Sequence, residues 1–215
     1  MARTMFHPSP TFLIGLPILA YLLGSVPWGL VLTRLFTSVD IRRQGSGNIG
    51  ATNVRRLAGT PLGLLTLAGD LLKGAAPVYL AANVTGLDPI QQALFVSIAA
   101  LAAFAGHLFP LYLKLKGGGK GVATAAGCFL VISPMSVLTA LIAFIIILGW
   151  SGRVSAGSLS AAAVLPAAVW WSLRSPVFCG CAVLMTALIF LRHKDNIRRL
   201  LTGSEPAVSE GKKRR

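Results

Sequence analysis

The chain has 215 residues, of which 54% are hydrophobic and 12% are charged, and its mean hydropathy is +0.73. A soluble protein of this composition would expose far too much apolar surface, so the sequence predicts an integral membrane protein. The formal net charge of +14 indicates attraction to anionic lipid headgroups. Binding of nucleic acid is disfavoured, because the basic residues lie between hydrophobic runs and lack interleaved aromatic side chains.

The first apolar run covers residues 11–36. It is expected to be a retained membrane span, because its core is too long for a signal peptide and no small-residue cleavage site is found in it. Arg3 is the one basic residue before the run, whereas Arg34, Arg42 and Arg43 follow its core. Because positive charge is retained on the cytoplasmic side, the N-terminus is predicted to lie outside.

A second span is expected at residues 61–83, and it carries Asp70 and Lys73. Charged side chains at membrane depth cost about 2.5 to 3.5 kcal/mol each on insertion scales, so they should pair or face a polar cavity. These two stand three residues apart on one helix face, and we expect them to pair with each other. A third apolar run ends at residue 113.

The next apolar run, residues 122–150, is too long for one crossing. As a single helix it would reach about 43 Å, against a hydrocarbon core of about 30 Å. Ser133 and Pro134 lie near its middle, where proline removes a helix hydrogen bond. Two helices joined there, followed by spans at 155–173 and 176–191, give seven crossings rather than six.

The distribution of Lys and Arg favours seven crossings. With seven, Arg3 and Arg174 face outside, and the other basic residues, apart from Lys73 within the second span, share the cytoplasmic side with the C-terminus. The predicted fold is therefore an all-α integral membrane protein with about seven transmembrane helices. Residues 1–203 form a single multi-span domain, and residues 204–215 form a basic tail whose polar composition predicts disorder.

The segment KGGGKG at residues 116–121 separates two of the apolar runs. Consecutive glycines let an anion approach peptide N–H groups, Lys116 and Lys120 supply cations, and the helix expected after Gly121 adds partial positive charge at its N-terminus. The segment predicts a phosphate-binding loop, with a flexible basic turn as the alternative. It is not a Walker A loop, since Gly121 stands where a magnesium-binding Ser or Thr is required.

Seven crossings bring three further polar segments to the same surface: GSGNIGATNVRR at 45–56, GRVSAGS at 152–158 and RHKDNIRRLLTG at 192–203. GSGNIG matches GxGxxG, but no strand precedes it, which excludes a dinucleotide-binding fold. A helix continuing from the seventh span would put His193, Asn196 and Arg199 on one face. A pocket rich in donors and poor in carboxylates suits two phosphates better than a metal ion, and no cofactor is expected.

Together with YLLGSVPWG at 21–29, DLLKG at 70–74 and GHLFP at 106–110, these segments resemble the motifs of the bacterial membrane glycerol-3-phosphate acyltransferases that use acyl phosphate as donor, the PlsY family. The resemblance covers nearly the whole chain. The family's loop usually reads KGGKG, so the third glycine leaves open whether Lys116 or Lys120 takes the phosphate. The resemblance implies seven helices in the bacterial cytoplasmic (inner) membrane, with the motif loops facing the cytoplasm.

The implied reaction is the first acylation of phospholipid synthesis, in which acyl phosphate and glycerol 3-phosphate give 1-acyl-sn-glycerol 3-phosphate and phosphate. The expected partners are these substrates, the lipid bilayer and the enzyme that supplies acyl phosphate. By similarity the catalytic residues are Ser46, His193 and Asn196. The substrate-binding residues implied in the same way are Asn48, Thr52, Asn53, Arg56, Lys116, Gly117, Gly118, Gly119, Lys120, Gly121 and Ser158. His193 has a pKa suited to accept a proton from the attacking hydroxyl, and the leaving phosphate is the alternative base.

Two competing functions remain open on the sequence alone. One is an acyltransferase that takes its acyl group from acyl-CoA or acyl carrier protein, although none of His7, His107 and His193 begins the His-x4-Asp signature of the other glycerolipid acyltransferases. The other is a transporter or channel for an anionic metabolite. A transporter should show internal repeats and polar groups that continue to the far side, and neither is evident.

Overall fold

The structure is a computed structural model, and it describes residues 8–208 of the chain. All regular structure in this part of the chain is helical, in agreement with the predicted all-α fold. The helices are α1 (Pro10–Gly24), α2 (Trp28–Phe36), α3 (Ala51–Ala58), α4 (Thr60–Ala82), α5 (Pro89–Leu108), the 3-10 helix η1 (Leu111–Leu113), α6 (Val122–Ile132), α7 (Pro134–Ser151), α8 (Val154–Leu173), α9 (Pro176–Arg192) and α10 (Lys194–Leu201).

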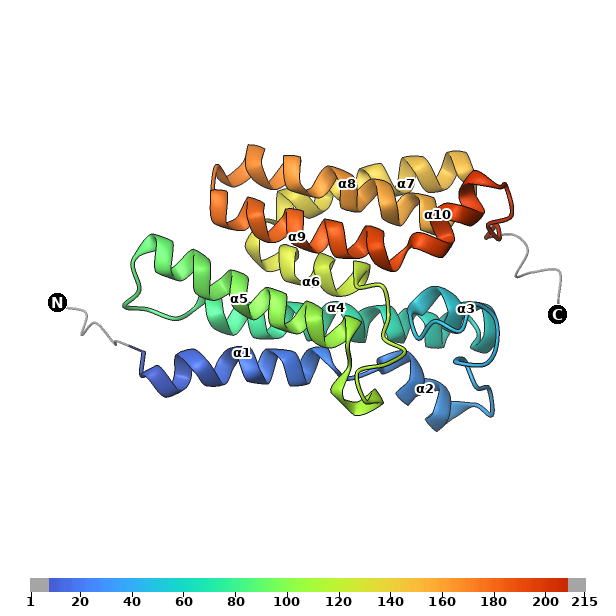
Figure 1. The fold of residues 1–215 in the computed structure, drawn as a ribbon, viewed down its shortest axis with the longest axis horizontal. Coiled ribbons are helices and arrows are strands. Elements are labelled where there is room, and N and C mark those ends of the chain that lie inside the picture. Colours follow the sequence, from blue (N-terminus) through green and yellow to red (C-terminus); the bar gives the residue numbers. More distant parts are fainter. Residues whose placement is uncertain (1–7, 209–215) are drawn as a thin grey trace.

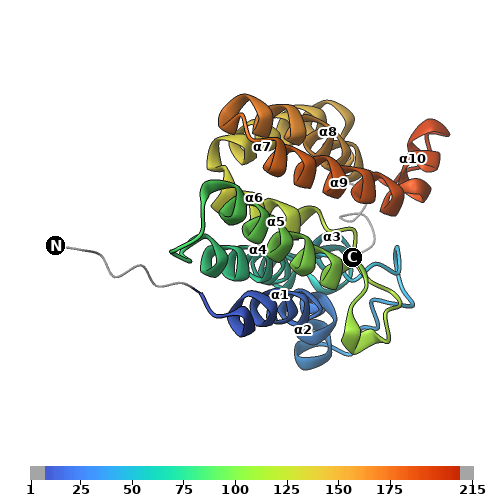
Figure 2. The same ribbon diagram turned by 60° about the vertical axis from the view of Figure 1, so that its left-hand side comes forward.

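The apolar helices lie side by side in layers (Figure 1). The helix α1 packs on α4 and α5, α4 packs on α6, and α8 packs between α7 and α9. The turned view shows α1 and α2 on one side of the bundle, α7 and α8 on the other, and α4, α5 and α6 between them (Figure 2). The short helices α2, α3 and α10 lie together at one end, where the polar segments are found.

Small residues let neighbouring helices approach closely. A Cβ atom on Gly24 of α1 would overlap the carbonyl oxygen of Ala103 in α5, and one on Gly74 of α4 would overlap that of Thr124 in α6. Close packing of this kind is the usual basis of helix association in a bilayer, because apolar side chains gain little by leaving lipid. The sequence thus specifies which helix faces meet.

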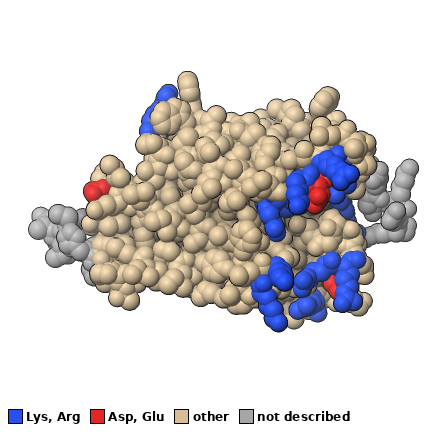
Figure 3. All heavy atoms as spheres, viewed as in Figure 1, with Lys and Arg blue, Asp and Glu red and all other residues tan. Residues whose placement is uncertain are grey.

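On the face drawn in Figure 3, charged side chains are sparse along most of the bundle, and Lys and Arg gather at one end. On α7, for example, Ile145, Ile146 and Trp150 point outward, and the buried residues are the small Ser136 and Ala140. Four of the described helices are long and apolar enough to cross a membrane by themselves, and six crossings result if each bent pair counts as one. The helix α6 has 11 residues and spans about 16 Å. Seven crossings, and their orientation, stay predictions.

The first apolar run, expected as one span at residues 11–36, is divided into two helices that together are long and apolar enough for one crossing. The helices α1 and α2 meet at an angle of 44° across Ser25, Val26 and Pro27. Pro27 lacks a backbone N–H and disfavours helical geometry in the residue before it, which favours a break at this point. The carbonyl of Val26, at the break, accepts hydrogen bonds from the N–H of Trp28 at 3.1 Å and from Lys73 Nζ at 2.9 Å.

The break predicted at Ser133 and Pro134 is confirmed, because α6 ends at Ile132 and α7 begins at Pro134. The chain reverses direction there. The start of α6 and the end of α7 lie at the same end of the bundle (Figure 1). There Lys120, just before α6, contacts Asn196, and Arg153, just after α7, contacts Glu205.

The predicted pairing of Asp70 and Lys73 is also confirmed, with 2.8 Å between Asp70 Oδ1 and Lys73 Nζ. His107 Nδ1 lies 3.6 Å from the same carboxylate oxygen and 3.1 Å from Thr124 Oγ1. These four side chains are buried and come from α4, α5 and α6. We call them the inner cluster.

The C-terminal tail differs from the expectation of disorder over residues 204–208. The N–H groups of Ser204 and Glu205 donate to the carbonyl of Arg199, and Val208 donates to the carbonyl of Gly152. Polar contacts rather than apolar burial hold these residues, which is why composition did not reveal them. Residues 209–215 lie outside the described part of the chain, and the boundary between residues 203 and 204 stays a prediction.

Candidate active site

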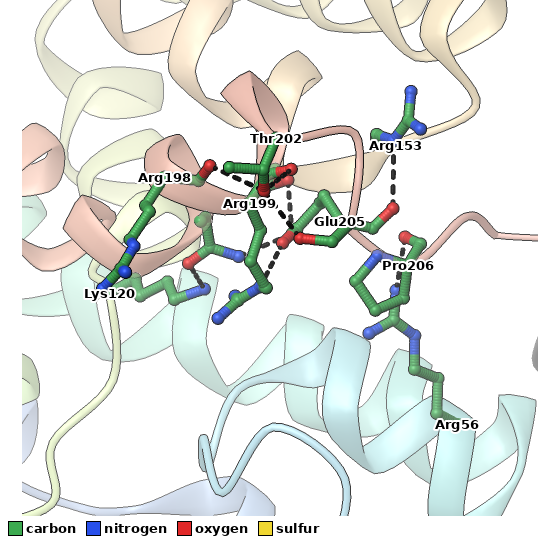
Figure 4. Close-up of polar contacts among 11 residues, drawn as sticks. Arg56, Lys120, Arg153, Arg198, Arg199, Thr202, Glu205 and Pro206 are labelled. Carbon is green, nitrogen blue, oxygen red and sulfur yellow. Dashed lines mark hydrogen bonds and ion pairs between the residues drawn. The ribbon is translucent and has the colours of Figure 1, made fainter.

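The four predicted polar segments come together at the basic end of the bundle. Lys120 Nζ, in the glycine-rich loop, donates to Asn196 Oδ1 of α10 at 2.6 Å. Arg153, before α8, donates through Nε to the carbonyl of Glu205 at 3.0 Å. Arg56 of α3 donates to the carbonyl of Pro206 at 3.3 Å (Figure 4). The convergence inferred from topology is therefore present, with residues 204–208 as a fifth element.

An open pocket of ≈ 450 Å³ lies among these segments. Its lining residues are Ser46, Asn48, Lys120, Leu191, Arg192, Lys194, Asp195, Asn196 and Arg199. Four of them are cations and one is a carboxylate, which favours an anionic ligand. The lining includes four residues that were expected in the site: Ser46, Asn48, Lys120 and Asn196.

The loop before α3 is organised by Asn53, whose side chain is buried. Its Nδ2 donates to the carbonyls of Ile41 (3.0 Å) and Asn48 (2.9 Å), and its Oδ1 accepts the N–H of Ser46 at 3.0 Å. Both ends of the amide are thus bonded to the loop backbone. Asn53 was expected to bind substrate, but the structure shows it holding Ser46 and Asn48 at the pocket wall, while Thr52 is half-buried in the first turn of α3.

Residues of α5 and α9 hold the glycine-rich loop at residues 116–121 through hydrogen bonds to its backbone. The N–H of Gly119 donates to the carbonyl of His107 at 3.1 Å, and a Cβ atom on Gly119 would overlap the His107 ring. Arg192 donates through Nη2 to the carbonyl of Gly118 at 2.7 Å and through Nε to that of Gly119 at 3.1 Å. The amide of Gly119, expected to hold a phosphate, is therefore already used within the protein. Gly117 and Gly121 adopt positive φ angles of 68° and 86°, which glycine tolerates best.

Between the two candidate lysines the geometry favours Lys120. Its ammonium reaches the pocket, whereas Lys116 is exposed and does not line it. Burial lowers the pKa of Lys120 to about 8; the Glu205 and Asp195 carboxylates oppose this shift, and Arg199 and Arg56 add to it. Lys120 is thus mainly protonated at neutral pH.

His193 occupies the junction between α9 and α10, which meet at 62°. The continuous helix expected through this region is wrong. Asn196 and Arg199 still share a face, since both contact Glu205, but His193 is buried and does not line the pocket. Its Nδ1 lies 2.8 Å from the Ile189 carbonyl, which can only accept, so Nδ1 carries the proton and Nε2 the lone pair. Burial, together with the Lys120 charge, lowers the pKa of His193 to about 4.

Ser158 is buried on α8 and does not line the pocket, although the resemblance implied that it binds substrate. Ser155, one turn earlier, instead donates to Glu205 Oε1 at 2.6 Å. Ser155, Arg192 and Glu205 are residues that sequence reasoning missed. A local signal existed for Glu205, because Gly203, with a φ of 71°, ends α10 and turns the chain back.

Fold and site together define a helical integral membrane protein with a cation-rich polar pocket at one end. The family profile described as "Glycerol-3-phosphate acyltransferase" matches residues 14–203. A relative from Syntrophotalea carbinolica, named glycerol-3-phosphate acyltransferase, is 51% identical over 187 residues, which are 86% of this chain and 92% of the relative. The chain belongs to the glycerol-3-phosphate acyltransferase family, and it is an acyltransferase.

Two crystal structures of PlsY, described as an integral membrane glycerol 3-phosphate acyltransferase, have the same fold. Each is 37% identical to this chain, and each comparison covers 91% of this chain and 94% of the other. The TM-score is 0.84 for the glycerol 3-phosphate form and 0.83 for the lysophosphatidic acid form. The resemblance recognised from the motifs is therefore confirmed.

Proposed function

We propose that this acyltransferase moves a fatty acyl group from acyl phosphate to glycerol 3-phosphate, giving 1-acyl-sn-glycerol 3-phosphate and inorganic phosphate. The observation that carries the proposal is the cation-rich pocket at the end of an apolar helix bundle. The PlsY structures with glycerol 3-phosphate and lysophosphatidic acid support the acceptor and the product. The donor rests on the motif resemblance and on the chemistry below.

Acyl phosphate is a mixed anhydride and is already activated, so the protein needs to supply positioning and charge stabilisation rather than a covalent nucleophile. In the proposed step, a hydroxyl oxygen of glycerol 3-phosphate attacks the acyl carbonyl carbon. The bond between that carbon and the phosphate oxygen breaks, and phosphate leaves with the electron pair. The hydroxyl proton passes to a base, and the two products balance the two substrates.

Lys120 is assigned to a substrate phosphate, with Ser46 and Asn196 beside it in the pocket. Asn48 and Arg56 are assigned to the second phosphate or to the acyl carbonyl. The proposed role of the remaining loop residues is to hold the backbone of the two loops in the conformation that forms the site. They are Thr52, Asn53, Gly117, Gly118, Gly119 and Gly121. Ser158 stays a predicted substrate contact.

The leaving phosphate is the better candidate for the base. A general base works best when its pKa is near the operating pH, and the pKa of about 4 makes His193 a weak proton acceptor. His193 lies where α9 ends and α10 begins, and its buried ring fixes that bend. Its proposed role is to place Asn196 at the pocket.

The proposed location is the bacterial cytoplasmic membrane, with the pocket facing the cytoplasm. The excess of Lys and Arg at the pocket end supports this orientation (Figure 3). Glycerol 3-phosphate would then reach the pocket from water, and the acyl chain would enter between helices from the inner leaflet. The enzyme that supplies acyl phosphate is a proposed partner.

The test uses purified, detergent-solubilised protein with labelled glycerol 3-phosphate. Palmitoyl phosphate and palmitoyl-CoA are supplied in turn, and labelled lysophosphatidic acid is measured. We expect product from the acyl phosphate and none from the thioester. Product from the thioester alone would overturn the donor assignment, and no product from either donor with folded protein would reject the reaction and direct attention to anion flux in vesicles.

A further inference from the structure

Glu205 is a buried acidic residue at the polar end of the bundle, with an exposed fraction of 7%. Its Oε1 accepts from Ser155 Oγ and from Asn196 Nδ2, both at 2.6 Å. Its Oε2 accepts from Arg199 Nε at 2.7 Å. One carboxylate therefore joins α8 to two successive turns of α10 (Figure 4).

The backbone around this carboxylate is also held by hydrogen bonds. Arg153 donates to the carbonyl of Glu205, Arg56 donates to that of Pro206, and the N–H of Val208 donates to the carbonyl of Gly152. The segment is thus anchored to α3, to the loop before α8 and to α10. These backbone contacts keep the Glu205 carboxylate within hydrogen-bond distance of its three donors.

The contacts form a directional chain from Glu205 to the pocket. A carboxylate only accepts hydrogen bonds and an ammonium group only donates them. Asn196 lies between the two, so it must turn Nδ2 toward Glu205 and Oδ1 toward Lys120. Without the carboxylate, Asn196 Nδ2 would lose this acceptor, and only the contact with Lys120 would hold the amide in this chain of contacts.

We propose that Glu205 is a positioning residue of the acyl-transfer reaction, which holds the amide of Asn196 so that its oxygen fixes the Lys120 ammonium at the pocket wall. The assignment rests on the proposed function, in which Lys120 holds a substrate phosphate, and it takes that phosphate to be the one of glycerol 3-phosphate. Glu205 does not line the pocket, so it acts through Asn196.

The charge of Glu205 adds a second effect on the same lysine. Burial by itself would raise the pKa of Glu205, but hydrogen bonds from Ser155, Asn196 and Arg199 outweigh it and hold the pKa below its usual value. The resulting negative charge favours the protonated form of Lys120. The Asp195 carboxylate acts in the same direction, and the positive charges of Arg199 and Arg56 act in the opposite one.

The experiment compares Glu205→Gln and Glu205→Asp with the wild-type full-length protein. Binding of glycerol 3-phosphate is measured by calorimetry from pH 6 to 9.5. The protonation of Lys120 is followed separately by competitive labelling with acetic anhydride and mass spectrometry. Asp40→Asn is the matched control, because it also removes one negative charge. The Asp40 carboxylate is half-exposed, and within residues 8–208 its one side-chain ion pair is with the exposed Arg43.

Glu205→Gln is expected to weaken binding of glycerol 3-phosphate by about tenfold at pH 7, the effect of losing a charge-assisted contact. Its Lys120 labelling midpoint should move to lower pH, because the neutral amide no longer favours the ammonium. Glu205→Asp keeps the charge but is one methylene too short to reach Asn196 and Arg199 together. It should bind several-fold more weakly than wild type, with a labelling midpoint close to that of wild type.

An unchanged labelling midpoint and unchanged affinity in Glu205→Gln would overturn the proposal and leave Glu205 as an anchor of the tail. Should Glu205→Gln fail to fold, the affinity of Glu205→Asp decides, and wild-type affinity in that variant would likewise overturn it. The labelling does not depend on turnover. A wild-type protein that neither binds glycerol 3-phosphate nor forms product would instead reject the proposed function.

Discussion

Two polar clusters lie in this helix bundle, and they differ in how completely their groups satisfy one another. In the inner cluster, Asp70 contacts Lys73 and His107, and Thr124 contacts His107. Lys73 also donates to the carbonyl of Val26 at the break between α1 and α2. All four side chains are buried. We call Lys120, Asn196, Arg199 and Glu205 the outer cluster; it borders an open pocket and carries more positive than negative charge.

The difference separates a structural from a functional use of charge. Buried ionic groups in lipid must find partners, and the inner cluster supplies them while tying α4, α5 and α6 to the break between α1 and α2. The outer cluster leaves cationic groups facing a pocket, where an anion can complete the balance. Charge in the first region should therefore control stability, and charge in the second should control substrate binding.

The largest effect is expected from Asp70→Ala. Removal of one partner leaves the Lys73 ammonium buried without its carboxylate, which costs about 3 to 5 kcal/mol in the free energy of unfolding. The thermal unfolding midpoint in detergent should fall sharply. Leu72→Ala, at a residue on α4 that is 65% exposed, is the control and should change the midpoint little. An unchanged midpoint in Asp70→Ala would show that the pair is dispensable.

Lys120→Ala should weaken substrate binding without affecting the fold. Loss of one charge-assisted contact costs about 1.5 to 3 kcal/mol, or about ten- to 150-fold in the dependence of rate on glycerol 3-phosphate. Lys116→Ala is the matched control, because Lys116 is exposed in the same loop. If Lys120→Ala changes this dependence less than about threefold, which is below about 0.7 kcal/mol, the phosphate role would pass to Lys116.

Gly119→Ala tests the point where the two clusters meet. The added methyl group would overlap the ring of His107, a member of the inner cluster, so the loop or the ring must move. Overpacking of this kind costs about 1 to 3 kcal/mol, and we expect both a lower unfolding midpoint and weaker substrate binding. Gly149→Ala adds the same methyl group on α7, where nothing lies within 4 Å, and should leave both measurements unchanged.

The pH dependence of binding should reflect Lys120. Burial lowers its pKa to about 8, so the ammonium is lost as pH rises through this value, and affinity for glycerol 3-phosphate should fall. At pH 9.5 the wild-type affinity should approach that of Lys120→Ala. Lys120→Arg keeps its charge, since the guanidinium pKa exceeds about 12. Its affinity should stay flat over the same range, and a parallel decline in this variant would point to another titrating group.

The smallest effect is expected from His193→Gln. Glutamine can still donate to the Ile189 carbonyl, and the buried imidazole has a pKa too low for an efficient base. The maximal rate should fall by less than about tenfold, since positioned general bases contribute about 10² to 10⁴-fold. A loss within that larger range, with normal unfolding and unchanged affinity for glycerol 3-phosphate, would restore His193 as the base.

The sequence predicted those features that depend on local chemistry. Ser133 and Pro134 ended a helix as expected, and the three-residue spacing of Asp70 and Lys73 predicted their contact. Convergence of the motif loops followed from topology. These inferences succeeded because proline geometry, helix periodicity and the distribution of charge act over short stretches of chain.

The features that were missed depend on tertiary contacts. The composition of the tail predicted disorder, but Glu205 is ordered by donors that lie from 6 to 50 residues away in sequence. Arg192 was read as one of several cytoplasmic charges, whereas it fixes the glycine-rich loop through backbone carbonyls. The break at Pro27 lies inside the motif YLLGSVPWG. That the Val26 carbonyl at this break accepts a hydrogen bond from Lys73 could be seen only in the folded structure.

The most direct test measures two quantities on the same three proteins: wild type, Lys120→Ala and Asp70→Ala. Calorimetry gives the Kd for glycerol 3-phosphate of the folded fraction, and thermal unfolding gives the midpoint. We predict weaker binding with a normal midpoint in Lys120→Ala, and a lowered midpoint with near-normal affinity of the folded fraction in Asp70→Ala. Normal binding in Lys120→Ala, or abolished binding in stable Asp70→Ala protein, would contradict the division between a binding cluster and a structural one.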